Sequence, residues 1–286
     1  MPRITPHQEQ QGFLTIAQNN ANTDYLKLAY VQAMSIKLTM PNSKYAVLVD
    51  KETELCITEK HRRVFDYVIT INNDYAKDEE WKLSNEWQVF DLTPFKETIK
   101  LESDIIFTRS VKHWWNAFRL KDVVLSTGCR DYKQEISDCR EYRRLFDDNE
   151  LPDVYNGLMY FRYSQSAHSF FNLTKQLYAN WEYISTTILK NCRDKNPTTD
   201  VVYALAAKII GVENTTLPSL DFINFVHMKP GINNWPNDPW HEIVNYELDL
   251  PMVRIAHTNQ YHPIHYYCKD WITNEIVKEY ENELGR

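Results

Sequence analysis

GFLTIAQNNANTDYLKLAYVQAMSIKLTMPNSKYAVLVD, residues 12–50, is the stretch that decides the fold. The apolar run Gly12–Gln18 predicts a short buried strand that ends in the polar loop NNANTD. Asp24 then precedes the segment YLKLAYVQAMSIKLTM, which predicts a helix that is capped by Asp24 and ended by Pro41. Tyr45–Asp50 (YAVLVD) predicts a second strand. A strand, a helix and a strand in such close succession predict two parallel strands joined by a crossover helix.

Strands and helices continue to alternate along the rest of the chain. The predicted strands are Tyr67–Ile71, Val123–Ser126, Val154–Arg162 and Thr98–Phe107, the last of which is broken by acidic residues. The predicted helices are Gln165–Lys190 and one that begins near Thr198. This alternation predicts an α/β fold with a mixed, mostly parallel sheet flanked by helices on both faces. No linker or repeat interrupts the sequence, so we expect a single domain with an elaborated, loop-rich C-terminal part. Ligands bind at the carboxyl ends of such strands. We therefore expect the loops after Gln18 and around Ser103 to bind the ligand.

Composition and charge exclude several functional classes. The formal net charge of −7 argues against non-specific coating of nucleic acid, because such binding needs Lys and Arg to neutralise phosphates. The 5 cysteines are widely spaced without a CxxC pair, which favours free thiols over a zinc or redox motif. The N-terminus lacks the apolar core of a signal peptide, and no apolar run approaches the ~20 residues that span a bilayer. We therefore expect a cytoplasmic protein without a membrane segment.

An acidic pair lies in the predicted strand TIKLESDIIF. On a regular strand, Glu102 and Asp104 would point to the same face. Two carboxylates on one face of a strand need a positive charge between them. Mg²⁺ or Mn²⁺ meets that need, because these ions take one or two carboxylates together with substrate phosphate oxygens. The spacing is compatible with a metal site, but so short a pattern is somewhat more often two solvated acids at a strand end.

Histidines and a lysine in the C-terminal part are further candidates. His227 in FVHMKPG would complete a metal shell and Lys229 would meet a phosphate, although a single histidine is more often structural. The later histidines, His257, His262 and His265, have no recognised metal spacing. We expect those three to be surface or packing residues.

Two polar residues begin predicted elements. Asp200 follows Thr198 and Thr199 at a helix start, where a capping role is the ordinary explanation. Asn156 precedes Gly157 at the start of an apolar strand, and such a pair ordinarily forms a turn. The alternative is that Asn156 presents its side chain to a ligand.

The order of these motifs resembles the GT-A-fold glycosyltransferases, and in particular their retaining, glycogenin-like branch. An ExD motif, an N-G-hydrophobic-M strand, a T-x-D helix start and a late strand ending in His follow one another along the chain. The resemblance implies that Glu102 and Asp104 bind the metal and the diphosphate, with His227 as the third protein ligand. It also implies that Asn156 contacts sugar or acceptor and that Asp200 lies close to the reacting carbon.

A tighter resemblance covers nearly the whole chain. The segments GFLTIAQNN, YLKLAYVQAMSIKLT, ESDIIFTRSVKHWW, STGCR, LPDVYNG, PTTDVVYALA and VHMK are similar, in this order, to GT-A-type enzymes of T-even-like bacteriophages and their marine relatives. Some members of that group are linked to sugars on 5-hydroxymethylcytosine in phage DNA, including arabinosyl groups. The resemblance implies a Mn²⁺- or Mg²⁺-dependent enzyme that moves arabinose, or as the second choice glucose, from a UDP-sugar to 5-hydroxymethylcytosine in DNA.

The same resemblance divides the single domain into a nucleotide-sugar-binding half, residues 1–110, and an acceptor-binding half, residues 111–286. The residues expected to bind the donor are Gln18, Asn19, Asp24, Tyr25, Asp50 and Lys229. Transfer to a surface or capsule glycan is an alternative in the same enzyme class. A nucleotide-sugar-binding protein without turnover is an alternative in a different class.

A DNA acceptor requires a local basic surface, because the target base must be flipped out of the stack. The candidate side chains are Arg109, Lys112 and Arg119 beside Trp114 and Trp115, and the run Arg140, Arg143 and Arg144. We expect the tryptophan pair to belong to the core. We expect the arginine run, which has acidic neighbours, to form a mixed, solvated helix face.

Overall fold

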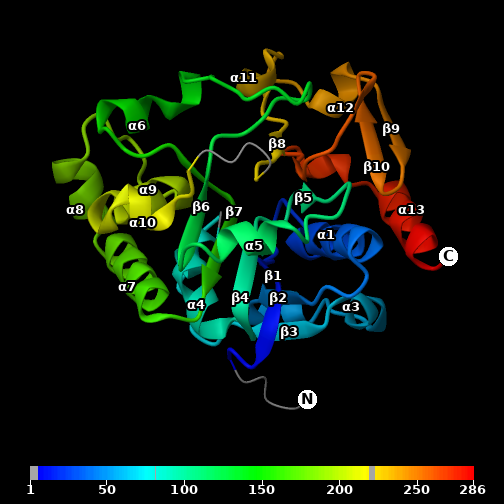
Figure 1. The fold of residues 1–286 in the computed structure, drawn as a ribbon, viewed down its shortest axis with the longest axis horizontal. Helices are drawn as coiled ribbons and strands as arrows, with labels where there is room; N and C mark the ends of the chain where they lie inside the picture. The colour runs from blue at the N-terminus through cyan, green and yellow to red at the C-terminus, as the bar shows by residue number, and fades with distance from the viewer. Residues whose placement is uncertain (1–5, 81, 219–222) are drawn as a thin grey trace.

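The computed structural model describes residues 6–80, 82–218 and 223–286. Its centre is a six-stranded sheet in the order β3-β2-β1-β4-β7-β6 (Figure 1). The strands are β1 (Glu9–Ile16), β2 (Tyr45–Val49), β3 (Tyr67–Thr70), β4 (Phe95–Leu101), β6 (Val123–Thr127) and β7 (Val154–Arg162). Strands β1 to β4 run parallel, and β7 is antiparallel to both of its neighbours. The predicted mixed, mostly parallel sheet is confirmed.

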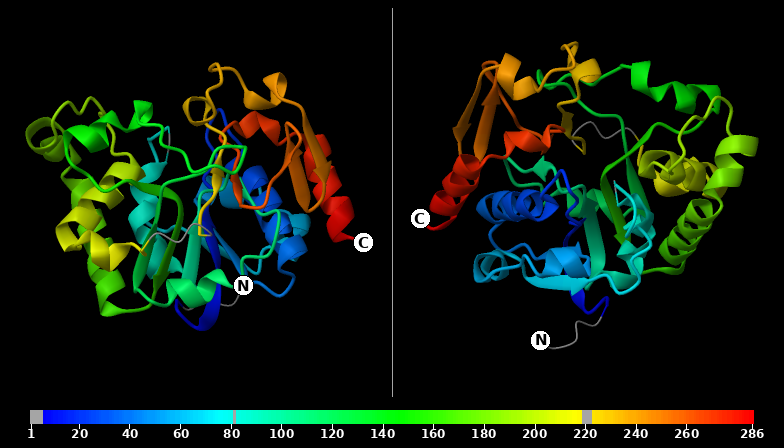
Figure 2. Two further views of the ribbon diagram at one scale, coloured as in Figure 1. Left: turned by 45° about the horizontal axis from the view of Figure 1, so that its top comes forward. Right: turned by 180° about the vertical axis from the view of Figure 1, so that it is seen from behind.

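Helices cover both faces of this sheet (Figures 1 and 2). On one face lie α1 (Tyr25–Thr39), α3 (Glu59–Val64) and α5 (Trp114–Phe118), and α13 (Asn274–Leu284) packs against α1. On the other face lie α4 (Val89–Leu92), α7 (Gln165–Ala179) and α9 (Thr199–Ile210). Each face has its own buried apolar cluster, because parallel strands bury side chains on both sides. Among the described residues, no helix is long and apolar enough to cross a membrane.

The remaining helical elements are short. They are α2 (Lys51–Glu54), η1 (Leu83–Gln88), η2 (Glu141–Arg143), α6 (Arg144–Asp148), α8 (Trp181–Tyr183), η3 (Ile184–Ile188), α10 (Val212–Thr215), α11 (Pro230–Asn233), α12 (Trp240–Ile243) and η4 (Lys269–Trp271). The C-terminal part also holds a three-stranded sheet of β9 (Tyr246–Asp249), β10 (Met252–Ile255) and β11 (Thr258–Asn259).

A second small sheet brings distant parts of the sequence together. It has the order β5-β12-β8, from β5 (Ile105–Ile106), β12 (Ile264–His265) and β8 (Val226–His227). His265 is paired with Ile105 on one side and with His227 on the other. The chain just after β4 is therefore fixed beside two histidines that come more than 100 residues later in the sequence.

The segment Thr98–Phe107 is broken at its acidic residues, as predicted, because β4 ends at Leu101 and a turn separates it from β5. One predicted helix differs from the structure. The predicted helix Gln165–Lys190 ends at Ala179 and is followed by α8 and the π-helix η3. In that second part the hydroxyl groups of Ser185 and Thr186 both donate to the carbonyl of Glu182, which competes with regular helical hydrogen bonding.

Asp66, just before β3, joins α1 to the start of β2. Its carboxylate oxygens lie 2.5 Å from Nζ of Lys37 and 2.9 Å from Nζ of Lys44, and accept the N–H of Tyr45 at 2.9 Å. Burial alone would raise the pKa of Asp66, but the hydrogen bonds from the two lysines and the amide lower it below the usual value. The folded state therefore binds a proton at this carboxylate less readily than the unfolded chain does.

Asp66→Asn should lower the free energy of unfolding by about 1–3 kcal/mol at neutral pH, because hydrogen bonds to a charged group are lost. The contribution of Asp66 is complete above about pH 4, the pKa of an unfolded aspartate, and disappears as the pH falls through the lower folded pKa. Urea unfolding of wild type and variant at several pH values tests this. A difference that stayed constant into the acid range would contradict it.

Candidate active site

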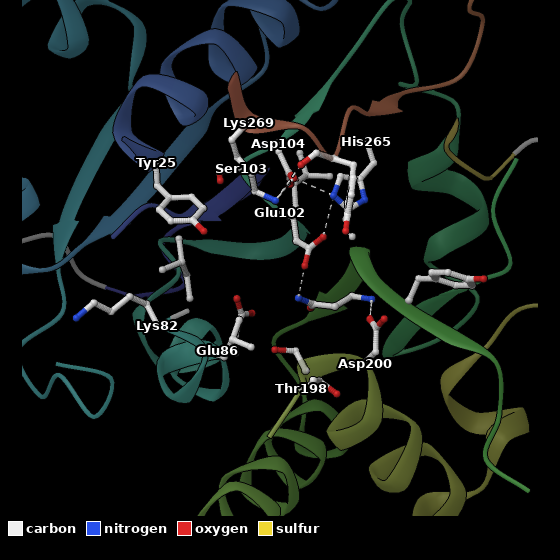
Figure 3. A pocket seen from close by; sticks show the side chains of 18 of the residues that line it. Tyr25, Lys82, Glu86, Glu102, Ser103, Asp104, Thr198, Asp200, His265 and Lys269 are labelled. Atoms are coloured by element: carbon white, nitrogen blue, oxygen red, sulfur yellow. Dashed lines mark hydrogen bonds and ion pairs between the residues drawn. The ribbon is translucent and has the colours of Figure 1, made fainter. Parts of the chain in front are cut away.

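A cavity of about 400 Å³ opens at the carboxyl ends of the central strands (Figure 3). Its walls come from the ends of β1 and β4, the start of β7, the start of α9, and the segments around β8 and β12. This is the edge at which ligands bind in open α/β sheets. The cavity therefore lies where the strand pattern predicted it.

The turn after β4 carries the acidic pair into the cavity. Glu102 donates its backbone N–H to the carbonyl of Gly157 at 3.0 Å, and the backbone carbonyl of Asp104 accepts the N–H of Tyr266 at 3.1 Å. Gln32, buried in the apolar helix α1, donates its amide to the carbonyls of Glu102 at 2.6 Å and Ile105 at 2.9 Å. These bonds satisfy the polar groups of a buried turn and fix its shape. The two acids thus meet because the turn is held from three sides, and not because they share a strand face.

Glu102 and Asp104 converge on His265 (Figure 3). The Nε2 atom of His265 lies 3.0 Å from Oδ2 of Asp104 and 3.4 Å from Oε2 of Glu102. One ligand atom from each of the three residues lies within 4.8 Å of the others. The Nζ atom of Lys269 lies 3.0 Å from Oδ2 of Asp104 on the same side. Sequence reasoning missed both His265 and Lys269.

Charge interactions govern the protonation of this group. Burial would raise the pKa of Asp104, but the positive charges of His265 and Lys269 outweigh it and hold the pKa well below its usual range. Burial would lower the pKa of His265, but the Asp104 carboxylate outweighs it and raises the pKa. Burial is the largest influence on Glu102 and raises its pKa. Asp104 therefore stays ionised.

The three residues form a donor set that suits a divalent cation. Two carboxylates and one imidazole nitrogen are ligands that Mn²⁺ and Mg²⁺ sites use. Oδ2 of Asp104 is buried, and Nε2 of His265 and Nζ of Lys269 each lie 3.0 Å from it. The buried carboxylate thus already faces positive groups, and a divalent cation would meet the same requirement for a positive charge beside it. The residues present therefore fit a metal ion.

His227 differs in position from the predicted third ligand. It lies one strand further from the acids, and its ring is stacked on that of His265 with centroids 4.4 Å apart. Its Nδ1 atom is buried and has no hydrogen-bond partner among the residues that the structure describes, and burial lowers its pKa well below the usual value. A neutral His227 supports the ring of His265 from behind. Within the described residues, the convergent group contains His265 in the place that the sequence suggested for His227.

Asn156 and Asp200 also line the cavity. The Oδ1 atom of Asp200 accepts the backbone N–H of Asn156 at 2.5 Å, and its Oδ2 atom lies 3.2 Å from Nη1 of Arg143. Asp200 is therefore held against β7 by these contacts. It lies in the first turn of α9, while the N-cap of that helix is Thr198. The predicted Asn156–Gly157 turn is wrong, because both residues belong to β7.

In the arginine run, Arg140 and Arg144 are exposed as predicted, whereas Arg143 differs from the prediction. Arg143 is 1% exposed, packs its guanidinium on the rings of Phe146 and Tyr155, and pairs with Asp153 and Asp200. It is a buried part of the site and not a solvated surface residue. A buried guanidinium needs such paired carboxylates.

Two of the predicted donor-binding residues line the cavity. Gln18 is held there by Asp50 at 3.2 Å and by Asn85, which donates to Oε1 of Gln18 at 2.8 Å. Tyr25 lines the cavity near the acidic turn, and burial raises its pKa. Asp50 itself caps α2 by accepting the N–H of Thr53.

The remaining predicted donor-binding residues, which are Asp24, Asn19 and Lys229, make local contacts. Asp24 caps α1, as predicted, by accepting the N–H of Lys27. Asn19 accepts the N–H of Leu26 and thereby fixes the loop that precedes α1. The Nζ atom of Lys229 lies 4.2 Å from the ring centre of Tyr142 and 5.8 Å from that of Tyr267, which lines the cavity.

Two other expectations are confirmed. Trp114 and Trp115 are buried, so the tryptophan pair belongs to the core. All five cysteines are free thiols.

The structure is similar to solved glycosyltransferases. A galactosyltransferase, LgtC, solved in complex with donor and acceptor sugar analogues, matches 96% of this chain and 95% of its own, with a TM-score of 0.55 and 11% identity. Mouse xyloside xylosyltransferase 1 matches 73% of this chain and 85% of its own, with a TM-score of 0.43 and 10% identity. The bifunctional glycosyltransferase WbbM matches 77% of this chain and 40% of its own, with a TM-score of 0.46 and 11% identity.

No protein-family model matches the sequence, and no curated protein matches it. At 11% identity, the similarity to LgtC along nearly the full length of both chains shows the fold. The chain has the GT-A glycosyltransferase fold that its motifs implied.

Proposed function

We propose that this protein is a metal-dependent glycosyltransferase that uses a nucleotide-sugar donor. The observation that carries the proposal is the convergence of Glu102, Asp104 and His265 beside Lys269, at the ligand-binding edge of a GT-A sheet. A divalent cation held by the three residues would offset the charge that develops on the diphosphate leaving group. Lys269 lies where it would add a second positive charge toward the same phosphates.

Asp200 faces this group across the cavity (Figure 3). Its carboxylate is oriented by the Asn156 amide and by Arg143, and it lines the same cavity of about 400 Å³ as the acidic turn. We propose that Asp200 stabilises the positive charge that develops at the reacting sugar carbon, which follows from its oriented and partly exposed carboxylate. Gln18 and Tyr25 would contact the donor from the β1 side.

We propose a UDP-sugar as the donor, with arabinose favoured over glucose, and 5-hydroxymethylcytosine in DNA as the acceptor. The support for these finer assignments is the ordered set of sequence blocks shared with the phage enzymes. The burial of Trp114, Trp115 and Arg143 leaves fewer candidates for a DNA surface. We therefore propose a glycan as the second possible class of acceptor.

One assay separates these proposals. The purified protein is incubated with Mn²⁺ or Mg²⁺, UDP-arabinose or UDP-glucose, and duplex DNA that contains cytosine or 5-hydroxymethylcytosine. Mass spectrometry of digested nucleosides should report an added pentose or hexose only on hydroxymethylcytosine, and EDTA should abolish it. UDP release without DNA modification would favour a glycan acceptor. Donor binding without any release of UDP would instead favour the binding protein without turnover.

A further inference from the structure

Lys100 is a charged residue in the middle of the central sheet. It lies on β4, two residues before Glu102, and its side chain is 1% exposed. Its Nζ atom lies 2.6 Å from Oε2 of Glu86 and donates to Oδ1 of Asn156 at 2.8 Å. A buried ion pair stabilises a fold less than well-packed apolar residues of the same volume do, so it is weak support for a purely structural role.

The contacts of Lys100 determine the orientation of the Asn156 amide. An ammonium group only donates hydrogen bonds, so the atom that faces Lys100 must be the carbonyl oxygen of Asn156. The NH₂ group of Asn156 then faces the other way and donates to Oε1 of Glu102 at 3.1 Å. A carboxylate only accepts, so this second bond requires the same orientation. Asn156 is 2% exposed, which leaves its side chain little freedom outside these two bonds.

This chain of contacts fixes one oxygen of Glu102 and leaves the other for the convergent group. Oε1 is taken by Asn156, and Oε2 lies 3.4 Å from Nε2 of His265. Groups that hold a ligating carboxylate in place by hydrogen bonding ordinarily govern metal affinity. We propose that Lys100 is a positioning residue that, through Asn156, orients Glu102 toward a bound divalent cation. This inference rests on the metal site of the proposed function, and it goes beyond that function by assigning a buried residue of the sheet to it.

The direction in which Lys100→Met changes Mn²⁺ affinity distinguishes a positioning role of Lys100 from a purely electrostatic one. Lys100 is one of the charges that act on Glu102, and a nearby positive charge opposes the binding of a cation. If Lys100 acted only through its charge, Lys100→Met would strengthen Mn²⁺ binding. If Lys100 positions Glu102, the same change should weaken Mn²⁺ binding by about 10- to 100-fold.

The test is a titration of the full chain with Mn²⁺, in which electron paramagnetic resonance measures the free ion. Lys100→Met should weaken binding about tenfold or more, Asn156→Leu should do the same, and the double variant should be no weaker than the weaker single variant. Lys37→Met, which breaks the ion pair with Asp66 far from the cavity, is the control for loss of stability. Thermal unfolding of each variant shows that it is folded.

Unchanged or stronger Mn²⁺ binding in Lys100→Met would overturn the inference while leaving the metal site intact. If Lys100→Met does not fold because Glu86 is left unpaired, Glu86→Gln is compared with Glu86→Gln/Lys100→Met. These two differ only at Lys100, and the second must bind Mn²⁺ more weakly. Wild type that bound no Mn²⁺ would contradict both the metal site and the inference. The titration needs no sugar transfer, so an incorrect donor or acceptor does not affect it.

Discussion

Asp104→Asn should reduce metal-dependent transfer or hydrolysis of the donor by about 1000-fold, which corresponds to a loss of about 4 kcal/mol of transition-state stabilisation. The change keeps the shape of the side chain but removes the buried charge that His265 and Lys269 both face. A neutral amide would bind Mn²⁺ poorly, and the compensation of charge on the diphosphate would be lost with it. Activity at saturating Mn²⁺ and Mn²⁺ affinity should therefore fall together.

Asp66→Asn is the matched control for this variant. It is also an aspartate that two cationic side chains hold, but it lies at the start of β3, outside the residues that line the cavity. It should lose stability and keep its Mn²⁺ affinity. If Asp104→Asn retained more than about a tenth of the activity of wild type, Asp104 would not hold the cation, and the metal-dependent mechanism would be wrong.

The fold could be predicted from the sequence because its elements have strong local signals. The strand at Gly12–Gln18, the helix capped by Asp24 and the strand at Tyr45–Asp50 are each fixed by residues close in the sequence. Where contacts between distant parts of the sequence determine the structure, the local pattern does not predict it. The shape of the turn at residues 102–104 is one such case, because Gln32 and the carbonyl of Gly157 hold it from outside the segment.

The site was predicted in part for the same reason. Glu102 and Asp104 carry a local motif, and both reach the cavity. His265 is brought to them by the pairing of β12 with β5, which no spacing within the sequence reveals. The segment IHYYCKDW does place a lysine four residues after a histidine, but this pattern alone does not show that they lie beside the acids. Arg143 was misassigned because its acidic neighbours in the sequence suggested a surface helix, whereas its partners Asp153 and Asp200 lie further along the chain.

The two stacked histidines give the second large prediction, since their contributions to Mn²⁺ binding should be unequal. His265→Ala should weaken Mn²⁺ binding and lower activity by more than about 100-fold, because Nε2 of His265 is the nitrogen that lies among the carboxylate oxygens. His227→Ala should cost less than about tenfold, because that ring supports His265 without belonging to the convergent group.

The pair is well matched for this test, because each substitution removes one imidazole from the same buried stack and the losses in packing are similar. Mn²⁺ titration and donor hydrolysis, measured on both variants under identical conditions, give the comparison. A larger loss of Mn²⁺ affinity in His227→Ala would mean that His227 is the metal ligand, as the sequence motif suggested. In that case β8 would have to move toward the acidic turn when the metal binds. Equal losses would mean that both rings serve the cation, so only a clear excess for His265 supports the ligand set Glu102, Asp104 and His265.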